Sequence, residues 1–241
     1  MLRFYCVCLT GRPDRSDNFE KIKEIIPSIT CVDAVDGSTM TKDTIDALVY
    51  SGFLNAQLED SVVSGRKFSY GQIACFLSHR KALLSVIEQE EEWAIIFEDD
   101  VELVPNFISK LNNVLNTVSQ ISKFDIIHMY VFDNQRNFFK EYDRPCILET
   151  PEGLWGLQMY LVRKESVPSI LDKLSYMKAA IDEQITRCEL SSFTLVNVQL
   201  VKSFHLPSSI ESTNVVIGET EDQRDGCTFS DQEQEDKKCS A

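Results

Sequence analysis

The sequence lacks several features that would assign a function class at once. It has no run of about 18 apolar residues, so we expect no membrane-spanning helix. Its first residues, MLRFYCVCLTGRPDR, contain neither a long apolar core nor a small-residue cleavage site, which predicts no signal peptide and a cytoplasmic or undetermined location. Lys and Arg number 24 against 38 Asp and Glu, and the net charge of −14 argues against nucleic-acid binding through a basic face.

Zinc-binding signatures are also missing. No Cys-x-x-Cys pair occurs, which argues against a zinc site, and the chain has only three histidines. Without a signal peptide we expect the eight scattered cysteines to be reduced thiols rather than disulfides. These are Cys6, Cys8, Cys31, Cys75, Cys146, Cys188, Cys227 and Cys239.

The chain is long enough for one sizeable domain. With 241 residues and 43% hydrophobic residues it can bury a substantial core. From Gly218 onward the composition changes to acidic and polar residues with almost no large apolar side chains. We therefore expect a domain over residues 1–217 and an acidic, disordered tail over 218–241.

Strand-like and helix-like segments alternate along the domain. Apolar segments rich in strand formers occupy 2–9, 30–37, 93–97, 124–132, 155–163 and 193–201. Helical spacing, with N-caps expected at Asp17 and Thr41, covers 17–26, 41–53, 69–92, 106–118 and 165–176. This alternation predicts an α/β doubly wound fold whose ligands bind beyond the carboxyl ends of the strands.

Three adjacent acids, Glu98, Asp99 and Asp100, follow the apolar strand predicted at 93–97. In an extended segment Glu98 and Asp100 point to one side and Asp99 to the other. The outer two could hold one divalent ion, and their hard oxygen atoms favour Mg²⁺ or Mn²⁺. Asp99 would then bind neighbouring backbone or a ligand hydroxyl. The alternative is a solvated turn with helix-capping acids.

The same region resembles a known family. IIFEDDVELVPNFISKL, preceded by GQIACFLSHRKALLSVI, resembles the hallmark of the glycosyltransferase 25 family, a Gly-Glu-Ile-Gly-Cys-x-x-Ser-His helix followed by a strand ending in Glu-Asp-Asp-Val. TGRPDR, AVDG, WGLQMYLVRKES and AAIDEQI resemble further family motifs, so the resemblance covers roughly residues 2–215. The chain departs from the family pattern at Gln72, Ala74 and Ala180, where Glu, Gly and Pro are usual.

The resemblance implies a GT-A-like fold, with a Rossmann-type mixed sheet flanked by helices, and a metal-dependent hexosyltransferase. The donor would be a UDP-sugar carrying glucose or galactose, and the cofactor Mn²⁺ or Mg²⁺. A metal on the diphosphate would offset the negative charge that develops on the leaving group. The CFLSH match favours the collagen-modifying branch, with hydroxylysine or galactosyl-hydroxylysine as acceptor. A lipopolysaccharide-type or other surface glycan is the second acceptor.

The resemblance also implies metal and donor residues. Glu98 and Asp100 match the Asp-x-Asp-like metal element, and His205 is expected as a further metal ligand unless it is a surface loop residue. Around the donor nucleotide we expect Thr10, Arg12, Arg15, Asp36, Ser78, His79, Asp99 and Trp155. Five of these have a structural alternative: solvated cations for the two arginines, a plain Asp-Gly turn for Asp36, and a core position for His79 and Trp155.

On the acceptor side, Asp182 and Glu183 match the family's Val-Asp-Glu turn. Asp182 is the candidate base that takes a proton from the acceptor hydroxyl, and its alternative is a helix N-cap. Two other function classes stay open, a metal-dependent phosphoesterase and a non-catalytic nucleotide-sugar-binding module. The sequence does not choose the sugar, the acceptor, the stereochemistry or the oligomeric state, for which a homodimer is one option.

Overall fold

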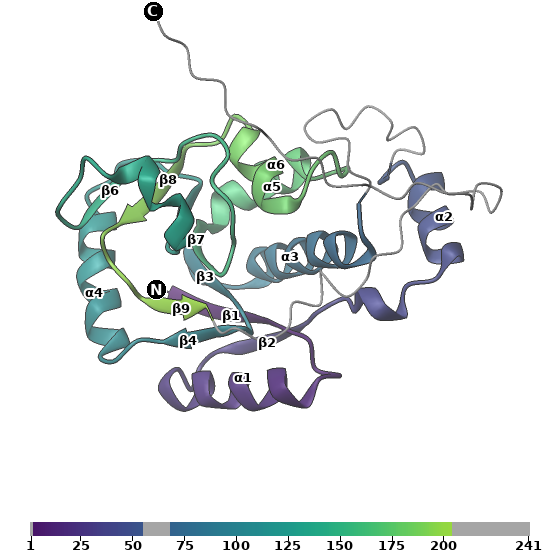
Figure 1. The fold of residues 1–241 in the computed structure, drawn as a ribbon, viewed down its shortest axis with the longest axis horizontal. Coiled ribbons are helices and arrows are strands. Elements are labelled where there is room, and N and C mark those ends of the chain that lie inside the picture. The colour runs from purple at the N-terminus through teal and green to yellow at the C-terminus, as the bar shows by residue number, and fades with distance from the viewer. Residues whose placement is uncertain (1, 55–67, 204–241) are drawn as a thin grey trace, which may run out of the picture.

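The computed structural model describes residues 2–54 and 68–203, which build a mixed seven-stranded sheet covered by helices (Figure 1). The strand order is β2-β1-β3-β7-β5-β8-β6. β1 runs parallel to β2 and β3, whereas β7 runs antiparallel to β3 and β5. The strands are β1 (Leu2–Cys8), β2 (Thr30–Asp33), β3 (Trp93–Glu98), β5 (Ile126–His128), β6 (Cys146–Glu149), β7 (Met159–Arg163) and β8 (Ser192–Val196). The predicted fold class, a mixed sheet flanked by helices, is confirmed.

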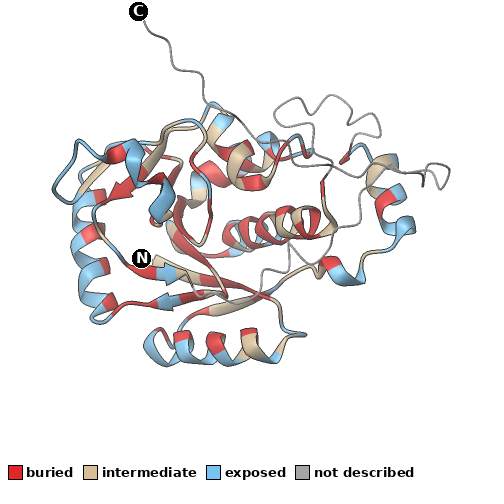
Figure 2. Cartoon of the chain, viewed as in Figure 1, coloured by how far each residue is buried: buried red, intermediate tan, exposed pale blue. Residues whose placement is uncertain are grey.

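Helices cover both faces of this sheet. α1 (Pro13–Ile25) and α4 (Phe107–Val118) pack on one face, and α3 (Tyr70–Glu88), α5 (Val167–Lys173) and α6 (Ile181–Arg187) pack on the other. α2 (Lys42–Tyr50) joins the second group through Ile45. The central strands are buried, and α1 and α4 expose their outer faces (Figure 2). Short 3-10 turns complete the chain at η1 (Gly37–Thr39), η3 (Asp133–Phe139) and η4 (Lys164–Ser166).

The helix starts follow local capping chemistry, with one correction. Thr41 caps α2 as predicted, accepting a hydrogen bond from the Thr44 N–H. Asp17 is not an N-cap, because α1 already begins at Pro13, whose ring fixes the backbone angle of a first helical residue. At α3, Ser69 and Gln72 form a reciprocal capping box, so Gln72 can replace the family's Glu without loss of the cap.

The last predicted strand, 193–201, is divided in the structure. β8 ends at Val196 because Asn197 adopts a left-handed backbone angle, φ 58°. β9 (Val201–Ser203) then pairs antiparallel with β4 (Val101–Leu103) in a separate two-stranded sheet. β4 and β6, of three and four residues, were not predicted.

The described residues bear on the predictions about membrane-spanning helices and about the cysteines. Within those residues, no helix has the length and apolar character needed to cross a membrane. The six cysteines in this part of the chain are free thiols, as expected. The tail lies outside the described residues, and the division into 1–217 and 218–241 stays a prediction.

Candidate active site

The three acids lie where β3 ends, next to the carboxyl end of β1. Val7 pairs in register with Glu98, so the parallel strands finish at the same edge of the sheet. A small cavity of about 100 Å³ opens at this edge. The acids, Arg15, Ser78 and His79 contribute to its lining. This is the position in which α/β sheets bind ligands, and residues 98–100 are called the acid turn below.

Arg15 points from α1 onto the acid turn. Its Nη1 lies 2.8 Å from Asp99 Oδ1 and 3.0 Å from Asp100 Oδ2, and the residue is only 4% exposed. Burial acts to lower the pKa of Arg15, but the two carboxylates raise it overall. The alternative of a solvated loop cation is therefore wrong for Arg15.

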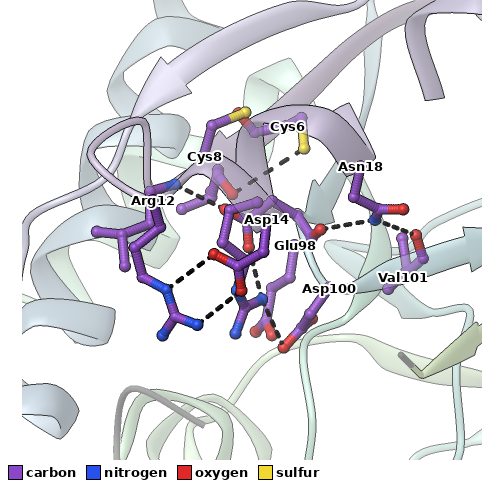
Figure 3. A network of polar contacts seen from close by, with 12 residues as sticks. Cys6, Cys8, Arg12, Asp14, Asn18, Glu98, Asp100 and Val101 are labelled. Carbon is purple, nitrogen blue, oxygen red and sulfur yellow. Dashed lines mark hydrogen bonds and ion pairs between the residues drawn. The ribbon is translucent and has the colours of Figure 1, made fainter. Parts of the chain in front are cut away.

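Asp99 fastens the turn to β1. Its Oδ2 accepts a 2.7 Å hydrogen bond from the Leu9 N–H. The Asn18 amide donates to the backbone carbonyls of Asp99 and Val101, at 2.8 Å each, and so holds the turn from α1 (Figure 3). Burial raises the pKa of Asp99, and the Leu9 hydrogen bond and Arg15 oppose this rise.

Glu98 faces a buried histidine. Its Oε1 lies 3.2 Å from His79 Nε2, and His79 Nδ1 lies 3.0 Å from the Tyr160 hydroxyl. Burial raises the pKa of Glu98, Asp100 and Asp182 raise it further, and His79 opposes them. His79 thus occupies the core, which was the structural alternative to donor binding, and it also contacts the acid turn.

Asp100 carries an unsatisfied oxygen. Its Oδ2 binds Arg15, but its Oδ1 is buried without a hydrogen-bond partner. The strict alternation predicted for the three acids is wrong, because the strand ends at Glu98 and Asp99 and Asp100 share Arg15 in a turn. An orphaned carboxylate oxygen beside a second carboxylate fits a hard divalent cation.

The other predicted donor residues make internal bonds. Ser78 accepts from the Val35 N–H and donates to the Ala74 carbonyl, which ties α3 to the segment after β2. Asp36 caps η1 through the Ser38 N–H. Thr10 donates to Asp33 at 2.6 Å, and Arg12 pairs with Asp14. None of these bonds tests donor binding, which stays a prediction.

Asp182 lies in the first turn of α6 rather than at its cap, which is Ala180, so the N-cap alternative is wrong. Its Oδ2 accepts a 2.9 Å hydrogen bond from the Gly156 N–H. Glu183 instead pairs with Arg187 at 2.7 Å. Trp155 is 54% exposed, so it is not a core residue. His205 lies outside the described residues.

Sequence reasoning missed Cys75, Tyr160, Asn18 and the packing role of Gly37. Cys75 and Tyr160 reach the site only through the tertiary packing of α3 and β7. Gly37 had a local signal, the Gly of AVDG. A Cβ there would lie 2.9 Å from the backbone of Tyr70 and Gly71, so glycine allows α3 to begin against this turn.

Comparisons with known proteins agree with the motif reading. A family model described as "Glycosyltransferase family 25 (LPS biosynthesis protein)" matches residues 1–185. A "Glycosyltransferase 25 family member" of Drosophila pseudoobscura pseudoobscura is 26% identical over 146 residues, 60% of this chain and 22% of the relative. The human "Procollagen galactosyltransferase 2" is 29% identical over 120 residues, 48% of this chain and 18% of the relative.

Other similar proteins differ in what their names state. The human "Inactive glycosyltransferase 25 family member 3" is 29% identical over 127 residues, 52% of this chain and 21% of the relative. The chain spans about a fifth of the length of these curated relatives. Among solved structures, A197 from STIV is similar over 92% of this chain and 96% of its own, with 11% identity and a TM-score of 0.38.

Proposed function

This chain belongs to glycosyltransferase family 25, and from this premise we propose that it transfers a hexose, glucose or galactose, from a UDP-sugar to an acceptor hydroxyl. The observation that carries the proposal is the acid turn, where Asp100 Oδ1 is buried without a hydrogen-bond partner and Glu98 and Asp100 line the same cavity. Glycosyl transfer from a nucleotide diphosphate needs positive charge at the leaving group. The turn is arranged to acquire that charge from a divalent ion.

Glu98 and Asp100 would hold the ion, and His205 is the proposed third ligand. Two carboxylate donors suit Mn²⁺ or Mg²⁺, which keep coordination positions for phosphate oxygens. When bound, the ion neutralises the charge of the departing diphosphate. Arg15 already offsets part of the charge of Asp99 and Asp100 and fixes the position of both carboxylates.

Asp182 is the proposed base for the acceptor hydroxyl. It lies within electrostatic reach of Glu98, and the Gly156 N–H orients its carboxylate. Thr10, Arg12 and Asp36 line the donor nucleotide side in this proposal, and the exposed indole of Trp155 offers a face for a sugar. Hydroxylysine or galactosyl-hydroxylysine of a collagen-like protein is the proposed acceptor, and a glycan is the second.

A second candidate function is a non-catalytic nucleotide-sugar-binding module. It is favoured by the similarity to relatives that are named inactive. Family membership gives no support to the phosphoesterase alternative. Both remaining functions require binding of the donor, but only the transferase turns it over.

The test compares Asp100→Asn with wild-type protein. Mn²⁺ binding is followed by electron paramagnetic resonance, and transfer is measured from UDP-glucose and UDP-galactose to a hydroxylysine-containing collagen-like peptide. We expect Asp100→Asn to lose both Mn²⁺ binding and transfer and to keep its fold. Asp172→Asn, an exposed acid on α5, is the matched control.

Full transfer by Asp100→Asn, or by wild-type protein after chelation, would overturn the metal-dependent assignment. Donor and Mn²⁺ binding without turnover on any acceptor would favour the binding module.

A further inference from the structure

A thiol, an imidazole and a carboxylate meet at the acid turn, from Cys75, His79 and Glu98. One ligand atom from each lies within 4.8 Å of those of the other two. Cys75 and His79 are four residues apart on α3 and therefore share one helix face. In residues 2–54 and 68–203 this is the one cluster of three such groups close enough to hold an ion.

This donor set differs in chemistry from the hard oxygen pair proposed for Mn²⁺ or Mg²⁺. A thiolate and an imidazole are ligands that Zn²⁺ prefers, and three protein ligands with one open position make a common zinc geometry. We propose that Cys75, His79 and Glu98 form a site for a thiophilic divalent ion of the Zn²⁺ class. A Cys-x-x-Cys signature in the sequence would not detect this site, because its ligands come from a helix and from the end of a strand.

The surrounding residues orient the imidazole for this role. His79 Nδ1 lies 3.0 Å from the hydroxyl of Tyr160, a side chain with no exposed surface. With the Nδ1–H donating to that hydroxyl, Nε2 presents its lone pair toward Glu98 and Cys75. A partner on the far nitrogen is the usual companion of a metal-bound histidine.

Binding of the ion involves no change of oxidation state. The S–H bond of Cys75 breaks, a metal–sulfur bond forms, and the proton passes to solvent. The proton shared between His79 Nε2 and Glu98 Oε1, which lie 3.2 Å apart, also passes to solvent, and each residue then makes one bond to the ion. Cys75 and Glu98 are half-buried and both line the cavity, so the ion can enter and its fourth position can face that space.

The two ions compete, because both use Glu98 as a ligand. An ion held by Cys75 and His79 withdraws Glu98 from the Glu98–Asp100 pair, so Zn²⁺ displaces Mn²⁺. Only the displacement of Mn²⁺ by Zn²⁺ depends on the proposed function. Zinc binding itself is measured without turnover, so its failure and that of the transferase proposal are distinguishable.

The experiment uses the full chain with Co²⁺ as a spectroscopic probe and Zn²⁺ in competition with a chelator. We expect a thiolate-to-cobalt charge-transfer band in wild-type protein and its loss in Cys75→Ser. Zn²⁺ affinity should fall at least about 100-fold in Cys75→Ser and about 10–100-fold in Tyr160→Phe, since loss of an outer-shell partner alone costs that much. Zn²⁺ should release Mn²⁺ from wild-type protein at a lower concentration than from Cys75→Ser, in which only direct competition for the Glu98–Asp100 pair remains.

Two control variants address the other thiols. Cys188→Ser removes a half-buried free thiol elsewhere in the fold, and Cys227→Ser/Cys239→Ser removes both cysteines of the predicted tail. Both should keep the band. A band that persists in folded Cys75→Ser, or disappears in either control, would overturn the proposal. Should Cys75→Ser not fold, unchanged Zn²⁺ affinity in Tyr160→Phe overturns it as well.

Discussion

Arg15 and Asp99 form a buried ion pair across 84 positions of sequence, with Nη1 2.8 Å from Oδ1. Replacing Arg15 by Met would leave two carboxylates of the acid turn without their cation. We expect a loss of about 3–5 kcal/mol in the free energy of unfolding, the usual cost of removing one partner from a buried pair. Urea denaturation of both proteins gives this value.

The control for this change is Arg12→Met. Arg12 pairs with Asp14 near the surface, where such a pair contributes about 0–1 kcal/mol. Equal stability of the two variants would contradict a structural role for the Arg15 pair.

Asp182→Asn should reduce transfer about 10²–10⁴-fold, the range that general-base help provides. Asn retains one oxygen that can accept from the Gly156 N–H but loses the second, which accepts from the Glu183 N–H at 2.8 Å. We therefore expect a small loss of stability and no change in the affinity for UDP-sugar. Glu183→Gln tests whether the adjacent acid is the base instead. Asp172→Asn on α5 reports any general effect of losing a carboxylate. Steady-state kinetics with each variant provide the measurement, and normal turnover by Asp182→Asn would remove it as the base.

Gly37→Ala should destabilise the native protein by about 1–3 kcal/mol, the typical cost of forcing a methyl group into a packed contact. The added Cβ would lie 2.9 Å from the backbone at the start of α3. Gly11→Ala is the matched control, since nothing lies within 4 Å of its Cβ position. Thermal melts of the two variants test the contact, and equal melting temperatures would contradict it.

His128 should make stability depend on pH. Burial lowers its pKa to about 4, a contact with the Gly156 backbone opposes this only in part, and neither ring nitrogen has a well-formed hydrogen bond. The unfolded chain titrates near 6.5, so between about pH 6.5 and 4 it binds a proton that the native chain does not. Native stability therefore falls as the pH falls through this window, by on the order of 3 kcal/mol at its lower end.

His128→Phe should remove this contribution, because Phe fills similar space and does not titrate. Denaturant unfolding of both proteins at several pH values measures the difference. Stability curves that stay parallel from pH 7 to 4 would show that His128 does not cause the loss.

The edge of the sheet that carries the site follows from local patterns. The apolar run 93–97 followed by three acids predicts a strand end, and β3 ends at Glu98. The partners of those acids do not follow from local sequence. Arg15 reaches them because Pro13 starts α1 earlier than the Asp17 cap predicts, so that Arg15 lies in a buried helical turn rather than in the loop before the helix.

Long-range convergence explains the other omissions. Cys75 and Tyr160 flank His79 from α3 and β7, and no spacing in the sequence links the two elements. Asn197 interrupts an apolar stretch that otherwise reads as one strand, because a single left-handed residue redirects the chain. Short strands such as β4 and β6 have too few residues to display a period.

The pairing of β4 with β9 has a consequence for the order of folding. β4 begins one residue after Asp100, and its first pair is Val101 with Ser203. Closing a loop of this length costs chain entropy that local contacts cannot offset early. During synthesis the segment behind the acid turn therefore stays without its partner strand until Ser203 has left the ribosome. A nascent chain stalled before β9 should carry all seven strands of the main sheet and an acid turn held by Arg15, Asn18 and the Leu9 N–H, with β4 still unpaired.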